Sequence, residues 1–183
     1  MQFSRHKLAI IIATIIIAAS GSLSAQTPQT AQEFFDRGNQ VFEKGDYDAA
    51  IADYSEAIKL RPVAWGAFNG RGNAYFRKGN NAAALADYTE AIRLNPEFVL
   101  ALYNRSLIHL NENRNDAALL DCKAAYRLKP DHADAHIVCG MAMHSKQELD
   151  GAILEYQTAI KLDPKNANAV ANLGDAYRDK NDH

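Results

Sequence analysis

Apolar and polar positions alternate with a helical spacing through most of this chain. In AFNGRGNAYFRKGN, Phe68 and Tyr75 lie on either side of Gly72 at intervals of three and four residues. The next segment, AAALADYTEAIRLNP, places Ala84 and Tyr88 at the same kind of spacing. Such intervals put apolar side chains on one face of an α-helix. Residues 67–96 therefore read as two amphipathic helices joined by a short turn.

This two-helix pattern recurs every 34 residues from residue 31 onward. Four sets of small residues or prolines keep one register: Gly38, Gly72, Ser106, Gly140 and Gly174; Ala50, Ala84, Ala118 and Ala152; Ala57, Ala91, Ala125 and Ala159; Pro62, Pro96, Pro130 and Pro164. A proline that ends each unit lacks a backbone donor and stops the second helix. No unit can bury its apolar face alone, so stacked units are predicted to form an all-α solenoid.

The turn inside each unit is predicted to need a left-handed residue that closes the first helix. Gly45 and Gly79 suit this conformation, and Asn113 tolerates it. Gln147 occupies the same place in the fourth unit and is a poorer cap, so we expect that turn to be looser.

The repeated pattern resembles the tetratricopeptide repeat. The residues that carry the resemblance are Phe68, Arg71, Gly72 and Tyr75 in the first helix and Ala84, Tyr88, Ala91 and Pro96 in the second. The resemblance implies a right-handed α-α superhelix of about four and a half units. The intervals are 31–64, 65–98, 99–132 and 133–166, with 167–183 as a C-terminal capping helix.

Residues 1–25 have the order of a secretory signal peptide. Arg5 and Lys7 precede an apolar run from Leu8 to Ala19, and small residues follow up to Ala25. We expect cleavage after Ala25, a short linker over 26–30, and a periplasmic or secreted product without stable membrane insertion. The alternative is an uncleaved anchor, although the run is shorter than the roughly 20 apolar residues of a spanning helix.

Composition and motifs argue against several classes of function. The chain has a formal charge of −2, and removal of residues 1–25 leaves 18 basic against 22 acidic side chains, so nucleic acid is not an expected partner. Serine hydrolase, zinc peptidase, phosphate-loop and dinucleotide-binding motifs are missing from the sequence. We therefore expect no enzyme activity and no cofactor.

By analogy with the family, the first helices line a concave groove that binds peptides. Each asparagine amide can donate and accept, which suits an extended peptide backbone, while aromatic residues offer apolar pockets. The competing interpretation is that asparagine is simply tolerated on an exposed helix face. The candidate groove residues are Asn39, Phe42, Asn69, Asn73, Phe76, Arg77, Tyr103, Asn104, Leu107 and Asn111.

Some repeats of this family grip the C-terminal carboxylates of heat-shock chaperones with a clamp of lysine, arginine and asparagine. Set against that clamp from the first or the second repeat, this chain matches some asparagines but has no basic member. Without a cationic donor a carboxylate has little to pair with, so chaperone-tail binding is not expected.

The stretch HADAHIVCGMAMH, residues 132–144, contains three histidines, a cysteine and two methionines. His136 and Cys139 could share a metal with Cys122, but no complete ligand set has a recognised spacing, and we expect no metal site. Cys122 and Cys139 either pair as a disulfide, as an exported protein would allow, or pack as two small apolar residues, the interpretation that we favour at this point.

These observations predict an exported, non-catalytic adaptor that binds a protein or peptide segment in its groove. Two alternatives stay open. One is a metal- or redox-responsive protein that uses Cys122, His136 and Cys139. The other is a membrane-tethered assembly factor, if the N-terminal segment is retained.

Overall fold

The computed structural model describes residues 30–181, which form nine α-helices and no strand. The predicted signal peptide and most of the 26–30 linker lie outside the described residues. The helices are α2 Ala31–Glu43, α3 Tyr47–Leu60, α4 Trp65–Arg77, α5 Asn81–Leu94, α6 Val99–Asn111, α7 Asn115–Leu128, α8 Ala133–Ser145, α9 Leu149–Leu162 and α10 Ala167–Asn181. Among them, none is long and apolar enough to cross a membrane.

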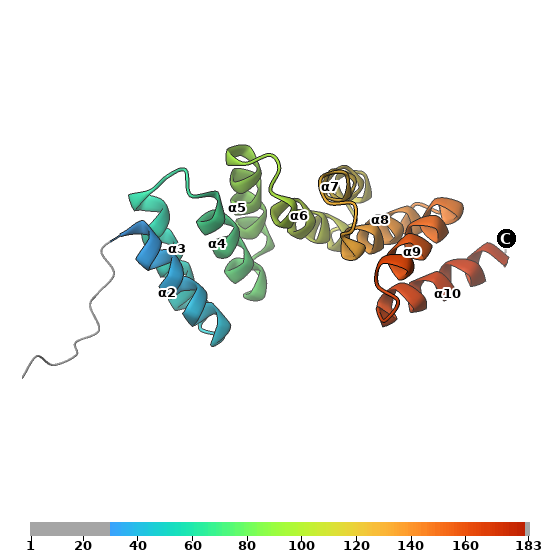
Figure 1. Ribbon diagram of the computed structural model, residues 1–183, viewed down its shortest axis with the longest axis horizontal. Coiled ribbons are helices and arrows are strands. Elements are labelled where there is room, and N and C mark those ends of the chain that lie inside the picture. The colour runs from blue at the N-terminus through green and yellow to red at the C-terminus, as the bar shows by residue number, and fades with distance from the viewer. Residues whose placement is uncertain (1–29, 182–183) are drawn as a thin grey trace, which may run out of the picture.

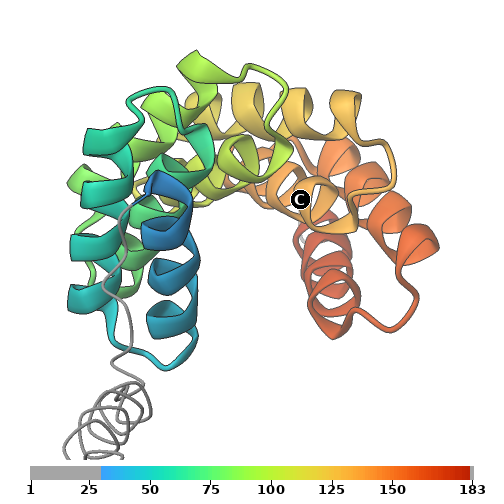
Figure 2. The ribbon, with the colours of Figure 1, turned by 60° about the vertical axis from the view of Figure 1, so that its left-hand side comes forward.

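Successive helices form four pairs, α2/α3, α4/α5, α6/α7 and α8/α9, followed by α10 (Figure 1). Each helix packs mainly on its neighbours in sequence, as expected for a linear array. The array curves, and α2 and α10 lie on the inner side of the arc while α3 lies on the outer side (Figure 2). The predicted all-α solenoid is confirmed.

A glycine in the first helix and a tyrosine in the second make the close contact between the two helices of a pair. A Cβ on Gly38 would lie 2.8 Å from the ring of Tyr54, and one on Gly72 would lie 2.7 Å from Tyr88. Because glycine has no side chain, each buried tyrosine ring lies flat on the backbone of its partner helix.

All four turns inside the pairs are closed by a left-handed residue. Gly45 and Gly79 have φ values of 82° and 77°, and Asn113 and Gln147 have 57° and 63°. The loosening expected at Gln147 is not found. Its backbone N–H donates to the carbonyl of His144 at 2.9 Å, as Gly45 does to the carbonyl of Phe42 at 2.9 Å. The backbone hydrogen bonds fix the turn, and glutamine adopts the left-handed conformation at a cost of roughly 1–2 kcal/mol.

Candidate functional site

An arginine–aspartate pair with a buried aspartate links the two helices in each of the first three repeats. Both oxygens of the aspartate accept hydrogen bonds from one guanidinium group, with the Nε atom at 2.7–2.8 Å from Oδ2. The pairs are Arg37–Asp53, Arg71–Asp87 and Arg105–Asp121, and all three aspartates are buried. Such two-pronged pairs fix the geometry of neighbouring helices. They are part of the scaffold, and their acidic groups are not available to a ligand.

The fourth repeat replaces this pair. Cys139 occupies the place of the arginine, and Glu155 that of the aspartate. His136 Nδ1 lies 2.6 Å from Glu155 Oε2, and its ring stacks on Tyr126 with 4.5 Å between ring centroids. The histidine therefore pairs with Glu155 in place of the missing arginine, and His136 itself is only 8% exposed.

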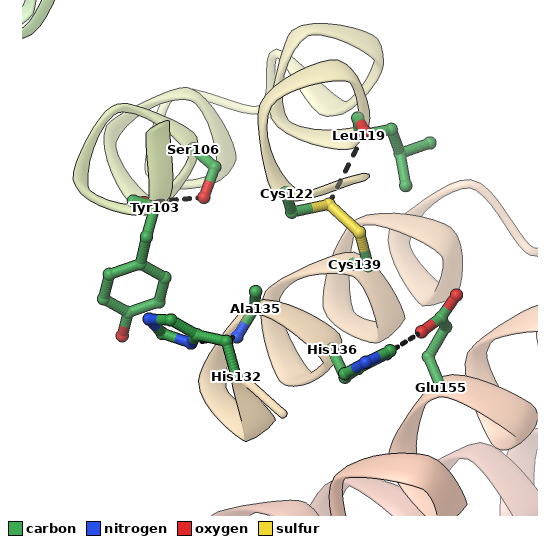
Figure 3. Close-up of a disulfide and its surroundings, with 9 residues drawn as sticks. All are labelled: Tyr103, Ser106, Leu119, Cys122, His132, Ala135, His136, Cys139 and Glu155. Atoms are coloured by element: carbon green, nitrogen blue, oxygen red, sulfur yellow. Dashed lines mark hydrogen bonds and ion pairs between the residues drawn. A yellow bond between two sulfur atoms is a disulfide. The ribbon is translucent and has the colours of Figure 1, made fainter. Parts of the chain in front are cut away.

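Cys122 and Cys139 form a disulfide bond between α7 and α8, with 5.7 Å between their Cα atoms (Figure 3). Both residues are completely buried, but the favoured interpretation of two unbonded apolar residues is wrong, because the two sulfur atoms are bonded to each other. Cys122 stands where the other three repeats have tyrosine, and Ser106 stands where they have the glycine beneath it. The smaller cysteine leaves space for the serine side chain, so the two exceptions to the repeat pattern compensate each other.

All three residues of the metal- or redox-responsive alternative have partners within the chain. Cys122 and Cys139 are bonded to each other, and His136 contacts Glu155. Within residues 30–181, no group of three or more His, Cys, Asp or Glu side chains is arranged to hold a metal ion. A disulfide sulfur also lacks the thiolate charge that binds a metal.

The asparagine residues of the predicted ladder bind one another and the tyrosines of the scaffold. The Tyr54 hydroxyl donates to Asn39 at 2.8 Å. Asn73 Oδ1 accepts two hydrogen bonds, from the Tyr88 hydroxyl at 2.7 Å and from the Asn104 amide at 3.0 Å.

Asn104 also reaches the buried Asn69, whose Oδ1 atom lies 3.3 Å from its amide nitrogen. These carbonyl oxygens therefore already accept hydrogen bonds within the chain, and peptide binding by the ladder stays a prediction. Asn39 and Asn73 provide acceptors for the hydroxyls of Tyr54 and Tyr88, whereas the buried hydroxyl of Tyr156 has no hydrogen-bond partner among the described residues.

The aromatic and cationic candidates in the first two repeats also have partners within the chain. The Phe42 ring lies 5.4 Å from that of Tyr47, and the Arg77 guanidinium group lies 5.0 Å from the centre of the same tyrosine ring. Phe76 packs against the Tyr88 cluster, whereas Asn111 is exposed at the end of α6. Phe42 and Arg77 therefore share Tyr47 as a partner, while Phe76 belongs to the cluster around Tyr88.

A hollow of about 300 Å³ lies on the groove face between α6, α8 and α10. Its apolar residues come from two repeats, and asparagines of α10 lie at its border. Tyr103, Leu107, Ile137, Val138 and Met141 form the apolar part, and Asp134, Asn168, Ala171 and Asn172 complete the lining. Tyr103 and Leu107 are the two predicted groove residues that the structure places in this hollow.

Ile137, Val138 and Met141 were missed by the sequence interpretation. They lie inside the His132–His144 stretch, which the sequence interpretation weighed only as a metal or disulfide site. Ile137 and Met141 stand 34 residues after Tyr103 and Leu107, so the period alone could have placed them in the groove.

Asp134 gives the hollow a negative edge. Burial raises the pKa of the Tyr103 hydroxyl, and the nearby charge of Asp134 raises it further. Tyr103 therefore stays protonated, and no basic side chain lines the hollow. The arrangement can hold an apolar or amphipathic side chain but contains no set of groups for acid–base chemistry.

A second hollow of about 300 Å³ lies near the start of α4. Its lining includes Phe35, Val63 and Trp65. It lies between the starts of α2 and α4 and includes the loop that precedes α4, so it is separate from the hollow on α6, α8 and α10.

Comparison with known proteins places these features in a family. The family model for the TPR repeat matches residues 38–79 and 140–181, and a second model, for the tetratricopeptide repeat, matches residues 71–133. Stress-induced-phosphoprotein 1 of Caenorhabditis elegans is 41% identical over 46 residues, which cover 25% of this chain and 14% of that protein.

Solved structures share the fold. MamA residues 41 to the end, from Desulfovibrio magneticus RS-1, align with a TM-score of 0.78 at 21% identity, over 86% of this chain and 89% of that one. The second TPR domain of human RPAP3, in complex with the HSP70 peptide SGPTIEEVD, aligns with a TM-score of 0.58 at 27% identity, over 60% of this chain and 92% of that one. The repeat matches, the paired helices and the shared superhelix together show that this chain belongs to the tetratricopeptide repeat family.

Proposed function

We propose that this protein is a non-catalytic interaction module that binds an extended peptide or protein segment on its groove face. The observation that carries the proposal is the hollow between α6, α8 and α10, where apolar side chains of two repeats meet with polar groups at the edge. Binding sites of this kind combine a mostly apolar lining with a few polar groups that fix orientation. The fold alone would not assign this role, because one fold supports many functions.

Asn168 and Asn172 would bind the backbone of the segment. Both asparagines line the hollow, and Asn168 is exposed. An asparagine amide pairs with the N–H and C=O groups of an extended chain whatever its side chains are. The segment would therefore pack the apolar part of one side chain on Ile137 and Met141 while its backbone contacts α10.

Affinity selection from a random 12-residue peptide library would test the proposal. Peptides enriched on the wild-type protein should lose at least about tenfold in affinity for Met141→Asn, because a short polar side chain would replace part of the apolar surface that the ligand covers. Met141 is 37% exposed, so this change should leave folding intact, as circular dichroism can verify.

Val63→Asn is the matched control. It places the same side chain in the second hollow, at a residue that is 61% exposed. Equal loss in both variants, or enriched peptides that bind Met141→Asn as well as they bind the wild type, would contradict the proposed site. A library that gives no enrichment would contradict peptide binding itself.

We further propose that the protein is exported. The support is the basic start, apolar run and small residues of segment 1–25. N-terminal sequencing of the mature protein should find Gln26 as its first residue. An intact Met1 in a membrane fraction would instead support the tethered alternative.

A further inference from the structure

We propose that the hollow between α6, α8 and α10 is a subsite for a lysine or arginine side chain, so that the bound segment is basic. This inference rests on the proposed function and names the class of its ligand. The geometry that carries it is the position of one exposed carboxylate, Asp134, in a lining whose other polar side chains, Tyr103, Asn168 and Asn172, are neutral.

The apolar lining fits the stem of a long cationic side chain. Lysine and arginine carry three or four methylene groups that pack on apolar surface while the charged end stays near polar groups. Leu107, Ile137 and Met141 offer that surface, and all three line the same hollow as Asp134. A short acidic side chain has no comparable stem to cover these residues.

Asp134 is available for a cation. Its carboxylate is exposed, and its one side-chain hydrogen bond among the described residues is a long one, 3.4 Å, from the neutral amide of Asn166. Asp134 lies on α8. The acidic residues of the neighbouring α10 are already paired, Asp175 with Arg178 and Asp179 with His144.

The local charge also disfavours an acidic ligand. A glutamate or a C-terminal carboxylate in the hollow would lie near Asp134 with no basic side chain in the lining to neutralise either group. Two carboxylates that lie a few ångströms apart near a protein surface repel each other. The HSP70 peptide SGPTIEEVD, bound by the RPAP3 domain, has three acidic residues, and we expect this hollow to reject a sequence of that kind.

The test is affinity selection from 12-residue peptide libraries in which one central position is lysine, norleucine or glutamate and the rest is random. On the wild-type protein, lysine peptides should be enriched about fivefold over glutamate peptides, the ratio that an exposed charge pair of about 1 kcal/mol gives. Norleucine peptides should fall between the two, because they keep the stem without the charge.

Two variants at residue 134 distinguish an effect of the charge from an effect of the side-chain shape. Asp134→Asn keeps the shape of the side chain and should remove the preference for lysine over norleucine. Asp134→Lys should reverse the order, so that glutamate peptides become the most enriched. Asp131→Lys makes the same change of charge at an exposed residue that does not line the hollow, and it should keep the wild-type order.

The outcomes distinguish this inference from the proposed function. Peptides that require Met141 but show no lysine preference, or an unchanged order in Asp134→Lys, would overturn the basic-ligand inference and leave peptide binding in place. An equal reversal in Asp131→Lys would also overturn it, because the preference would then come from overall charge. A lack of any enrichment on the wild-type protein would overturn both.

Discussion

Replacing Asn73 by alanine removes the acceptor of two hydrogen bonds at once. The Tyr88 hydroxyl donates to Asn73 at 2.7 Å, and the Asn104 amide donates at 3.0 Å. Tyr88 is 1% exposed, so its hydroxyl has little access to water after the change. Asn104 is only half-buried and can turn its amide toward solvent, so most of the expected cost comes from Tyr88.

A buried donor left without an acceptor costs about 1–3 kcal/mol. Alanine recovers roughly 0.5–0.7 kcal/mol through its higher helix propensity. The expected net loss in the free energy of unfolding is therefore about 0.3–2.5 kcal/mol. For a chain of this length, that corresponds to a fall in Tm of about 1–10 °C.

Denaturant unfolding followed by circular dichroism measures this loss, and Asn111→Ala is the matched control. Asn111 is also in a first helix but is exposed, so the control gains helix propensity without removing a buried contact. A double-mutant cycle with Tyr88→Phe should show a coupling energy of about 1 kcal/mol. If Asn73→Ala and Asn111→Ala unfold at the same denaturant concentration, the asparagine–tyrosine bond does not stabilise the fold and the reasoning fails.

Three further changes test other parts of the structure. Gly140→Ala should destabilise the fold by about 1–3 kcal/mol, because the new Cβ would lie 2.5 Å from the Tyr156 ring. Gly174→Ala should stabilise it by up to about 1 kcal/mol, because a Cβ there would meet nothing within 4 Å. Thermal melts should show these opposite signs. Reduction of the Cys122–Cys139 bond should cost about 3 kcal/mol in denaturant titrations with and without reductant, and a variant with alanine at both cysteines should show no effect of reductant. Burial and then the charge of Arg114 lower the pKa of His109, so the native state binds protons less readily than the unfolded state below about pH 6.5. The stability advantage of the wild type over His109→Met should therefore shrink as the pH falls from about 7.5 to 5, and a difference independent of pH would refute this.

The repeat pattern predicted the helices because it records contacts that recur in every unit. Gly38 and Gly72 are read correctly as packing residues since each lies under a tyrosine of its own repeat. His136 could not be explained in the same way. The histidine is accounted for by the loss of an arginine at residue 139. Only the structure shows that His136 then pairs with Glu155.

The candidate site was harder to predict than the fold. Tyr103 and Leu107 were identified from their register, but Met141 was hidden in a stretch whose composition suggested metal binding. Asn73 was assigned to ligand binding because the sequence shows that its amide can form hydrogen bonds. The sequence does not show which group the amide binds. That partner, Tyr88, is 15 residues away on the next helix.

The disulfide crosses a boundary between repeats, since Cys122 belongs to the third and Cys139 to the fourth. In a linear array, each boundary is a plane along which the stack can separate, and the ends open first. A covalent bond at the third boundary prevents the fourth repeat from fraying without the third. Tyr103 and Met141, on opposite sides of that plane, should therefore exchange their backbone amide protons with one common opening free energy, so that the two halves of the hollow persist or open as a unit.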